Sequence, residues 1–127
     1  MSGWGGGYVT DVSYLAHYYL EQSPHMLAAA CLIAGYDPGF SGEAPGLHYL
    51  ELGCGRGRNA LVQAAANPSW RVTAIDFTPA AIAEARQVAA AARLDNITFI
   101  EADLSDFAET AAAAALGEVD VVSMHGV

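Results

Sequence analysis

The sequence predicts an α/β fold built on a parallel sheet, and two observations support this. Short apolar runs rich in Val, Ile and Leu alternate with alanine-rich segments between residues 47 and 124. Strands covered on both faces by helices have continuous apolar runs of this kind, and strand–helix alternation is typical of parallel sheets with right-handed connections. The first run is followed by three glycines at alternate positions, a turn that allows positive φ and close backbone approach to a ligand.

Composition excludes several classes of protein. The chain has 127 residues, one domain's worth, and a net charge of −9 with only five basic residues, all arginine. No basic stripe is available for a nucleic-acid backbone, so we expect no general nucleic-acid binding. No apolar run reaches membrane-spanning length and no signal peptide is visible, so we expect a cytoplasmic protein without a membrane partner. The two cysteines, Cys31 and Cys54, predict neither a disulfide framework nor a metal site.

The first 45 residues are expected to form an N-terminal helical cap. The aromatic segment Tyr8 to Leu20 is interpreted as a helix in which Tyr14 and Tyr18 share a face. That face either docks on the sheet or closes over a ligand as a lid, since phenols combine stacking area with a hydrogen bond. Ser23-Pro24 then predicts the start of a second helix, with Ser as N-cap and Pro at the first position, ending near Ala34.

The sheet domain is expected over residues 46–127, and Leu47 to Ala60 organises it. A buried strand over residues 47–52 leads into the glycine turn, and a helix follows over residues 58–66. The free N–H groups of that helix would point back at the turn. The stretch therefore predicts a seat for a nucleotide-like ligand, although such a turn can also simply connect a strand to a helix.

The remaining elements alternate as the fold class requires. We expect Thr78 to cap the longer helix, and a polar residue to follow each strand. The predicted strands cover residues 70–76, 97–100 and 119–124, and the predicted helices cover residues 79–93 and 109–116.

Polar side chains at the strand ends are the candidate ligand contacts, because ligands of open α/β sheets bind at the carboxyl ends of the strands. Asp76 follows Gly57 by 19 residues, the expected place for a carboxylate that accepts both hydroxyls of a ribose. Phe77 is expected to lie against an adenine ring. Asp103 would accept from the adenine amino group, and Leu104 would cover a ring face. The alternative for Asp76 is a cap on the helix that begins at Pro79, and the alternative for Asp103 is the start of a solvated loop with Asp106.

Two registers of the glycine turn compete. Residues 55–60 satisfy the Gly-x-Gly-x-x-Ala pattern of a dinucleotide fold, which would indicate an NAD-type oxidoreductase. The second register uses Glu51 together with Gly53, Gly55 and Gly57. A carboxylate there would repel a pyrophosphate but suits a ligand carrying cationic amino and sulfonium groups. The second register is therefore favoured.

In this register the stretch resembles the first motif of class I S-adenosylmethionine-dependent methyltransferases, and residues 47–127 resemble the first half of that fold. The resemblance implies a Rossmann-like sheet truncated after its fourth strand, since the fifth strand and the final antiparallel pair of the family are missing. An unpaired sheet edge would result, so we expect a homo-oligomer or a shortened chain. Three segments resemble more narrowly the bacterial group with a methyltransferase regulatory domain, which is similar to protein-lysine methyltransferases: residues 7–14, 51–57 and 125–127.

The resemblance implies an S-adenosylmethionine-dependent methyltransferase, or its cofactor half, with S-adenosylhomocysteine as product. Glu51 would face the amino acid part of the cofactor, and the turn with Cys54 would pass under it. His125 lines the methyl-transfer pocket or merely ends a strand, and Tyr14 is a lid candidate. No catalytic residue is assigned, and the methyl acceptor is unknown, a protein being one candidate. A non-catalytic cofactor-binding module is the other alternative.

Overall fold

The fold is described by a computed structural model that places residues 15–127. The predicted lid residue Tyr14, and residues 1–14 as a whole, lie outside the described residues. Tyr14 as a cofactor contact therefore stays a prediction.

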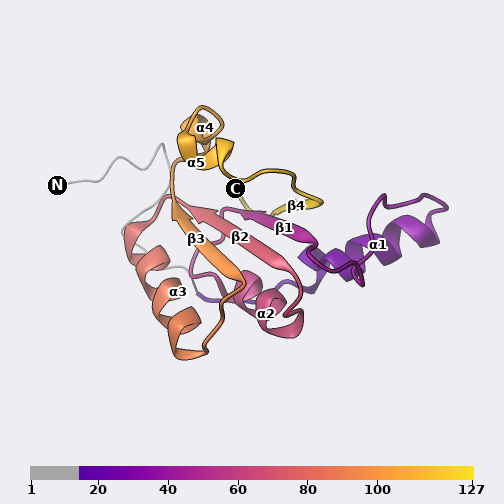
Figure 1. Ribbon diagram of the computed structural model, residues 1–127, viewed down its shortest axis with the longest axis horizontal. Coiled ribbons are helices and arrows are strands. Elements are labelled where there is room, and N and C mark those ends of the chain that lie inside the picture. The colour runs from indigo at the N-terminus through magenta and orange to yellow at the C-terminus, as the bar shows by residue number, and fades with distance from the viewer. Residues whose placement is uncertain (1–14) are drawn as a thin grey trace.

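Four parallel strands form a single sheet in the order β3-β2-β1-β4 (Figure 1), which confirms the predicted Rossmann-like fold. β2 and β3 extend the sheet on one side of β1, and β4 lies on its other side. The direction of sheet growth therefore reverses at β1, the position where ligands bind in folds of this kind. The strands are β1 (His48–Leu52), β2 (Arg71–Asp76), β3 (Ile97–Glu101) and β4 (Val121–Met124).

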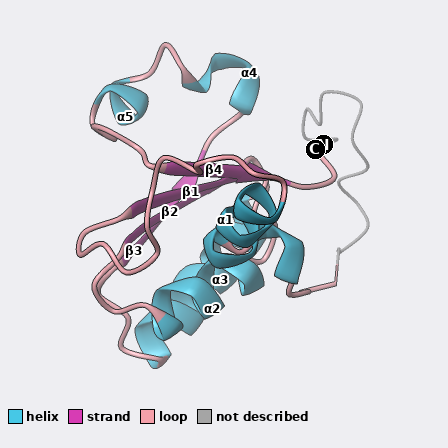
Figure 2. Cartoon of the chain, turned by 90° about the vertical axis from the view of Figure 1, so that its right-hand side faces the viewer, coloured by secondary structure: helices cyan, strands magenta, loops and turns pink. Residues whose placement is uncertain are grey.

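Helices cover the two faces of the sheet unequally. The longer ones lie on one face and two single-turn helices lie on the other (Figure 2). The first group is α1 (Pro24–Ile33), α2 (Arg58–Ala66) and α3 (Pro79–Ala91), preceded by the 3-10 turn η1 (Leu20–Gln22); the second is α4 (Leu104–Phe107) and α5 (Ala111–Ala114).

Each face has its own apolar core. The side chains of Tyr49, Val72 and Phe99 point toward the face that α2 and α3 cover. Leu50 and Ile75 point to the opposite side, where Phe107 and Leu116 cover them. This alternation follows from the period of two along a strand. It also determines which strand residues can reach a site on each face.

The predicted aromatic helix over residues 8–20 is wrong for the part that the structure describes. Residues 15–19 are not helical, and Tyr19 is extended, with φ −109° and ψ 102°. Tertiary contacts explain this: Gln63 donates to the Tyr18 hydroxyl at 3.3 Å, and the Tyr19 ring lies 4.2 Å from the His125 ring. A helical periodicity alone cannot anticipate such contacts.

The helix starts are predicted correctly, but their capping is not. Neither Ser23 nor Thr78 makes a side-chain cap hydrogen bond, although each occupies the N-cap position. Before α3, the Asp76 carboxylate instead accepts the backbone N–H of Thr78 at 2.8 Å. The predicted helix over residues 109–116 is shorter, α5, and Thr110 caps it by accepting from the N–H of Ala113.

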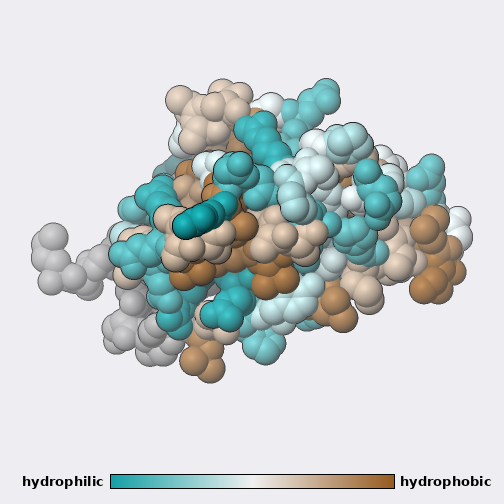
Figure 3. Space-filling view, turned by 60° about the horizontal axis from the view of Figure 1, so that its bottom comes forward, coloured by the Kyte–Doolittle hydropathy of each residue, from teal (hydrophilic) through white to brown (hydrophobic). Residues whose placement is uncertain are grey.

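Two apolar surfaces stay exposed in the described part of the chain. On the edge strand β4, Val122 is 53% and Met124 58% exposed. At the end of α1, Leu32 is 63% and Ile33 88% exposed; Figure 3 shows apolar surface at the right-hand end of the molecule, where α1 lies in Figure 1. Between residues 15 and 127, no helix is long and apolar enough to cross a membrane.

Candidate functional site

The glycine turn after β1 needs glycine at all three positions, but for different reasons. Gly53, Gly55 and Gly57 have φ of 70°, 55° and 75°, the left-handed region that side chains rarely adopt. A Cβ at Gly57 would lie 2.6 Å from Phe99, and one at Gly53 would overlap Val127. A Cβ at Gly55 would meet nothing within 4 Å. Gly55 is therefore the position where the backbone faces open space.

The end of β2 holds this turn in place. Asp76 Oδ2 accepts the N–H of Gly55 at 2.8 Å, and the Ile75 carbonyl accepts the N–H groups of Gly53 and Cys54 at 2.8 and 2.9 Å. Each Asp76 oxygen thus has one backbone donor, and each still has a free lone pair. The structure gives Asp76 an organising role, and ribose binding stays a prediction.

Glu51 at the end of β1 is buried and incompletely bonded. It is 3% exposed, and its Oε2 has no hydrogen-bond partner; the Oδ1 of buried Asn59 also lacks one. Burial raises the pKa of Glu51 to about 7, and the Asp76 carboxylate adds to this, while the Asn59 amide and the Ala60 N–H act in the opposite direction. Two unsatisfied acceptors therefore lie beside the turn, where an unpaired polar group is costly.

A buried polar network surrounds Glu51 and was not predicted from the sequence. The Tyr49 and Ser123 hydroxyls are 2.5 Å apart, and Asn59 Nδ2 donates to the Tyr49 hydroxyl at 3.2 Å. These contacts connect β1, β4 and α2. The sequence held one signal for this network. Tyr49 and Glu51 are two residues apart in an otherwise apolar strand, so their side chains lie on the same face.

Gln22 is a second residue that the sequence analysis missed. It is 5% exposed and lies between Glu51 and the backbone after β4. With its amide nitrogen toward Glu51, Gln22 donates to Glu51 Oε1 at 3.3 Å and accepts the N–H of His125 at 3.2 Å. Nothing in the local sequence distinguishes this glutamine from a surface residue.

His125 lies at the rim of the site and is not buried in it. Its ring lies 4.2 Å from the Tyr19 ring, and its Nε2 is 3.8 Å from Glu21 Oε1. The predicted position after β4 is confirmed, whereas a role in the methyl-transfer pocket is untested.

The other predicted contacts occupy the same edge with structural partners of their own. Asp103 Oδ1 accepts from the N–H and hydroxyl of Ser105, both at 2.8 Å, so this carboxylate caps α4. Leu104 packs against the core on the α4 side, and Phe77 is half-buried directly after β2. Cys54 is buried, and burial raises the pKa of its thiol, so the sulfur stays protonated. Their contacts with adenine stay predictions.

A side-chain ion pair at the surface also connects the glycine turn to α3. Arg56 donates through Nε to Glu84 Oε2 at 2.8 Å and through a second nitrogen to Glu84 Oε1. Both side chains reach solvent, so water and salt screen the pair and it contributes little to stability.

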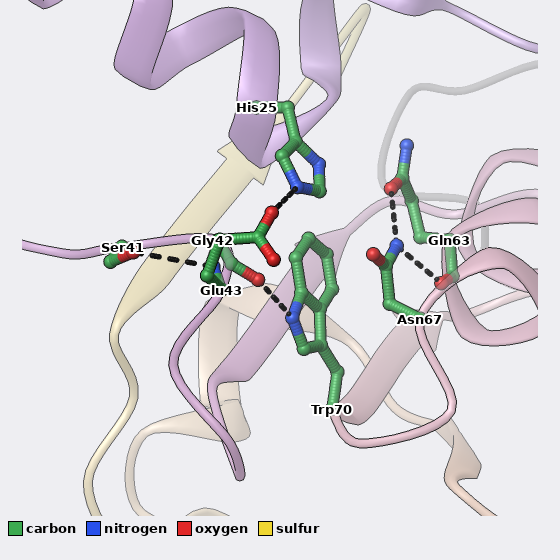
Figure 4. Close-up of polar contacts among 7 residues, drawn as sticks. All are labelled: His25, Ser41, Gly42, Glu43, Gln63, Asn67 and Trp70. Carbon is green, nitrogen blue, oxygen red and sulfur yellow. Dashed lines mark hydrogen bonds and ion pairs between the residues drawn. The ribbon is translucent and has the colours of Figure 1, made fainter.

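A separate polar cluster lies near the start of β2, at the opposite edge of the sheet from the carboxyl ends of the strands (Figure 4). The His25 ring stacks on Trp70 at 5.1 Å, and Trp70 Nε1 donates to the carbonyl of Gly42 at 2.9 Å. Glu43 Oε1 is 4.0 Å from His25 Nε2. These contacts fix α1 and the following loop to the sheet. Within residues 15–127, no three His, Cys, Asp or Glu side chains are grouped as metal ligands.

The geometry defines a Rossmann-like domain with a buried carboxylate and an open glycine turn at the reversal point of its sheet. Residues 43–127 match the model of a methyltransferase domain family. The chain therefore belongs to this family of methyltransferase domains. This assignment favours the Glu51 register of the turn over the dinucleotide register.

Three known proteins that are similar to this chain are longer than it. It is 33% identical over 128 residues to an uncharacterized protein of Synechocystis sp., sll1526, covering 98% of this chain and 23% of the relative. The structure of PKMT2 from Rickettsia typhi in complex with AdoHcy superposes with a TM-score of 0.76 and 23% identity, over 90% of this chain and 21% of that one. Magnesium protoporphyrin IX methyltransferase (ChlM) of Synechocystis PCC 6803 with bound SAH superposes with a TM-score of 0.52 and 28% identity. The match covers 79% of this chain and 39% of that one. The chain thus spans less than a quarter of the length of the first two.

Proposed function

We propose that this chain binds S-adenosylmethionine at the carboxyl ends of β1 and β2 and serves as the cofactor-binding part of a methyltransferase. The observation that carries the proposal is the buried Oε2 of Glu51, which has no partner and belongs to a residue two positions before the glycine turn. Natural proteins seldom keep a buried carboxylate without a donor unless a ligand supplies one.

The residues present fit the cationic end of this cofactor. The unpartnered oxygens of Glu51 and Asn59 both accept hydrogen bonds, as an ammonium group requires. No arginine within residues 15–127 forms an ion pair with Glu51, so a ligand ammonium would supply the missing positive charge. The cofactor itself would supply an activated methyl group on its sulfonium sulfur.

The chain's own contribution would be binding and orientation. Asp76 fixes the Gly55 N–H and keeps free lone pairs for hydroxyl donors, which suits a ribose. The absence of a Cβ at Gly55 leaves room for the ligand against the backbone. Holding the donor in line with an acceptor accounts for a large part of the rate enhancement in transfers of this type.

For the acceptor we propose a protein side chain, lysine by preference. The resemblance of residues 7–14, 51–57 and 125–127 to protein-lysine methyltransferases supports this, and so does the fold shared with PKMT2. The net charge of −9 would attract a cationic acceptor. A cytoplasmic location, and a homo-oligomer formed through the edge of β4, belong to the same proposal.

Calorimetric titration with S-adenosylhomocysteine and with NAD tests the cofactor. Saturable binding of S-adenosylhomocysteine, with no binding of NAD, is expected, and the reverse preference would overturn the proposal. Incubation with labelled S-adenosylmethionine and a lysine-rich acceptor protein tests the transfer. Binding without transfer would favour the non-catalytic module.

A further inference from the structure

We propose that Gln22 is a positioning residue that orients the Glu51 carboxylate for the cofactor and connects it to the backbone after β4. The inference rests on the proposed function, since it assigns a residue to the same site. Gln22 belongs to η1, outside residues 43–127 that match the methyltransferase family model. The N-terminal segment would therefore be part of the cofactor site.

The orientation of the Gln22 amide follows from its neighbours. The N–H of His125 can only donate, so the oxygen of the amide must face it at 3.2 Å. The amide nitrogen then faces Glu51 Oε1 at 3.3 Å and donates to it. In the opposite orientation, the amide nitrogen would face the His125 N–H, and the amide oxygen would face Glu51 Oε1, so neither hydrogen bond could form. Gln22 therefore bridges an acceptor on β1 and a donor after β4.

The bridge leaves the second Glu51 oxygen for a ligand. With Oε1 taken by Gln22, Oε2 is the atom without a partner. A hydrogen bond from a neutral amide to one oxygen stabilises the charged carboxylate and fixes its direction. Removing that donor leaves the carboxylate less stabilised in its charged form.

The titratable groups facing Glu51 disfavour its charge or are neutral, whereas the Asn59 amide and the Ala60 N–H favour the charged form. Tyr49 on β1 and Cys54 in the turn are both raised in pKa by burial and by Glu51 itself, and Asp76 on β2 repels it. Asn59 on α2 and Gln22 are uncharged amides, and His125 takes part through its backbone N–H. No cation among these groups would mask the loss of the Gln22 hydrogen bond.

The test compares Gln22→Met with Gln63→Met. Methionine keeps the size of glutamine and removes its hydrogen bonds. Gln63 is the matched control, because it is also buried and holds the same segment through the Tyr18 hydroxyl without contacting Glu51. Gln22→Glu is a second variant of equal size that places an acceptor beside Glu51.

Two readouts separate this inference from the proposed function. The carboxyl carbon-13 resonance of Glu51, assigned by its loss in Glu51→Gln, reports its titration without ligand. Its midpoint, expected near 7 in the parent chain, should rise by about half a unit or more in Gln22→Met and further in Gln22→Glu. S-adenosylhomocysteine should then bind more weakly to Gln22→Met at pH 7, by roughly twofold or more, and nearly equally at pH 8.5.

The midpoint decides the inference. An unchanged midpoint in both Gln22 variants, or an equal rise in Gln63→Met, would overturn the positioning role. Failure of the parent chain to bind S-adenosylhomocysteine would overturn the proposed function, whatever the midpoints are.

Discussion

The Asp76 carboxylate accepts the backbone N–H of Gly55 at 2.8 Å, so the residue that ends β2 fixes the turn that follows β1. The position of Asp76 in the sequence predicts a ligand contact. In the folded chain it first shapes the surface that the ligand would meet. A single substitution at Asp76 should therefore affect stability and binding together.

Asp76→Ala should lower the free energy of unfolding by about 1–3 kcal/mol, because the N–H groups of Gly55 and Thr78 lose their acceptor. It should also weaken S-adenosylhomocysteine binding roughly tenfold or more, as expected for loss of a charged hydrogen-bond acceptor. Urea denaturation and calorimetric titration measure the two effects. Asp120→Ala is the control, since Asp120 accepts the N–H of His48 at 2.7 Å, at the other end of β1. Equal losses of affinity in both variants would contradict the assignment.

Gly55 and Gly117 form a matched pair for testing the open turn. Both have positive φ, 55° and 70°, and a Cβ at either would meet nothing within 4 Å. Replacement by alanine should cost about 1 kcal/mol of stability at each, from backbone strain alone. Only Gly55→Ala should weaken binding of S-adenosylhomocysteine, because its methyl group would occupy the ligand side of the turn. Unchanged affinity in Gly55→Ala would show that no ligand passes there.

Glu51 should make stability depend on pH in an unusual direction. Its pKa is raised from an ordinary 4.5 to about 7, so between these values the folded chain holds a proton that the unfolded chain has released. Stability should therefore fall by about 3 kcal/mol as the pH rises from 4.5 to 7, and then level off.

Glu51→Gln removes this decline. The variant should match the parent chain near pH 4.5, unfold at a higher temperature at pH 8, and bind S-adenosylhomocysteine more weakly. Thermal unfolding followed by circular dichroism at the two pH values measures the first part. A parent chain whose stability rises over this interval would contradict an unpaired, buried Glu51.

The Tyr49 hydroxyl should contribute to stability, because its hydrogen bonds join β1 to β4 and α2 inside the core. Tyr49→Phe leaves Ser123 Oγ and Asn59 Nδ2 without their partner inside the core and should cost about 1–3 kcal/mol. Tyr18→Phe removes a hydroxyl that is bonded only at 3.3 Å to Gln63 and should cost less than about 1 kcal/mol. Urea denaturation compares the two; similar costs would argue against a network joining β1 and β4.

The fold was predictable because the signals for it are local. Apolar runs, a glycine turn and Ser-Pro or Thr-Pro dipeptides locate strands and helix starts, and all four strands and α1 to α3 are where these signals indicate. The single-turn helix α4 has no such signal, and the extended backbone at Tyr19 depends on its contact with His125. Both are decided by tertiary packing.

The positions of the candidate site residues could be predicted from the sequence, but their hydrogen bonds could not. Glu51, Asp76 and the glycines can be read from strand ends and spacing. The hydrogen bond from Gly55 to Asp76 spans 21 residues, and the contacts of Gln22 with Glu51 and His125 join three separate segments. Such pairings depend on the strand order and on the path of the N-terminal segment. Neither of these can be predicted from the periodicity of the sequence.

The most direct test of the cofactor site is a nitrogen-15 NMR titration of this chain with S-adenosylhomocysteine. The shape of the chain offers a competing location, a cavity of about 210 Å³ lined by Arg71, Thr98 and Ala112 on the α5 side of the sheet. We expect the largest amide shifts at Gly55, Asp76 and Asn59. Shifts confined to the cavity beside α5, with these three amides unmoved, would contradict this expectation.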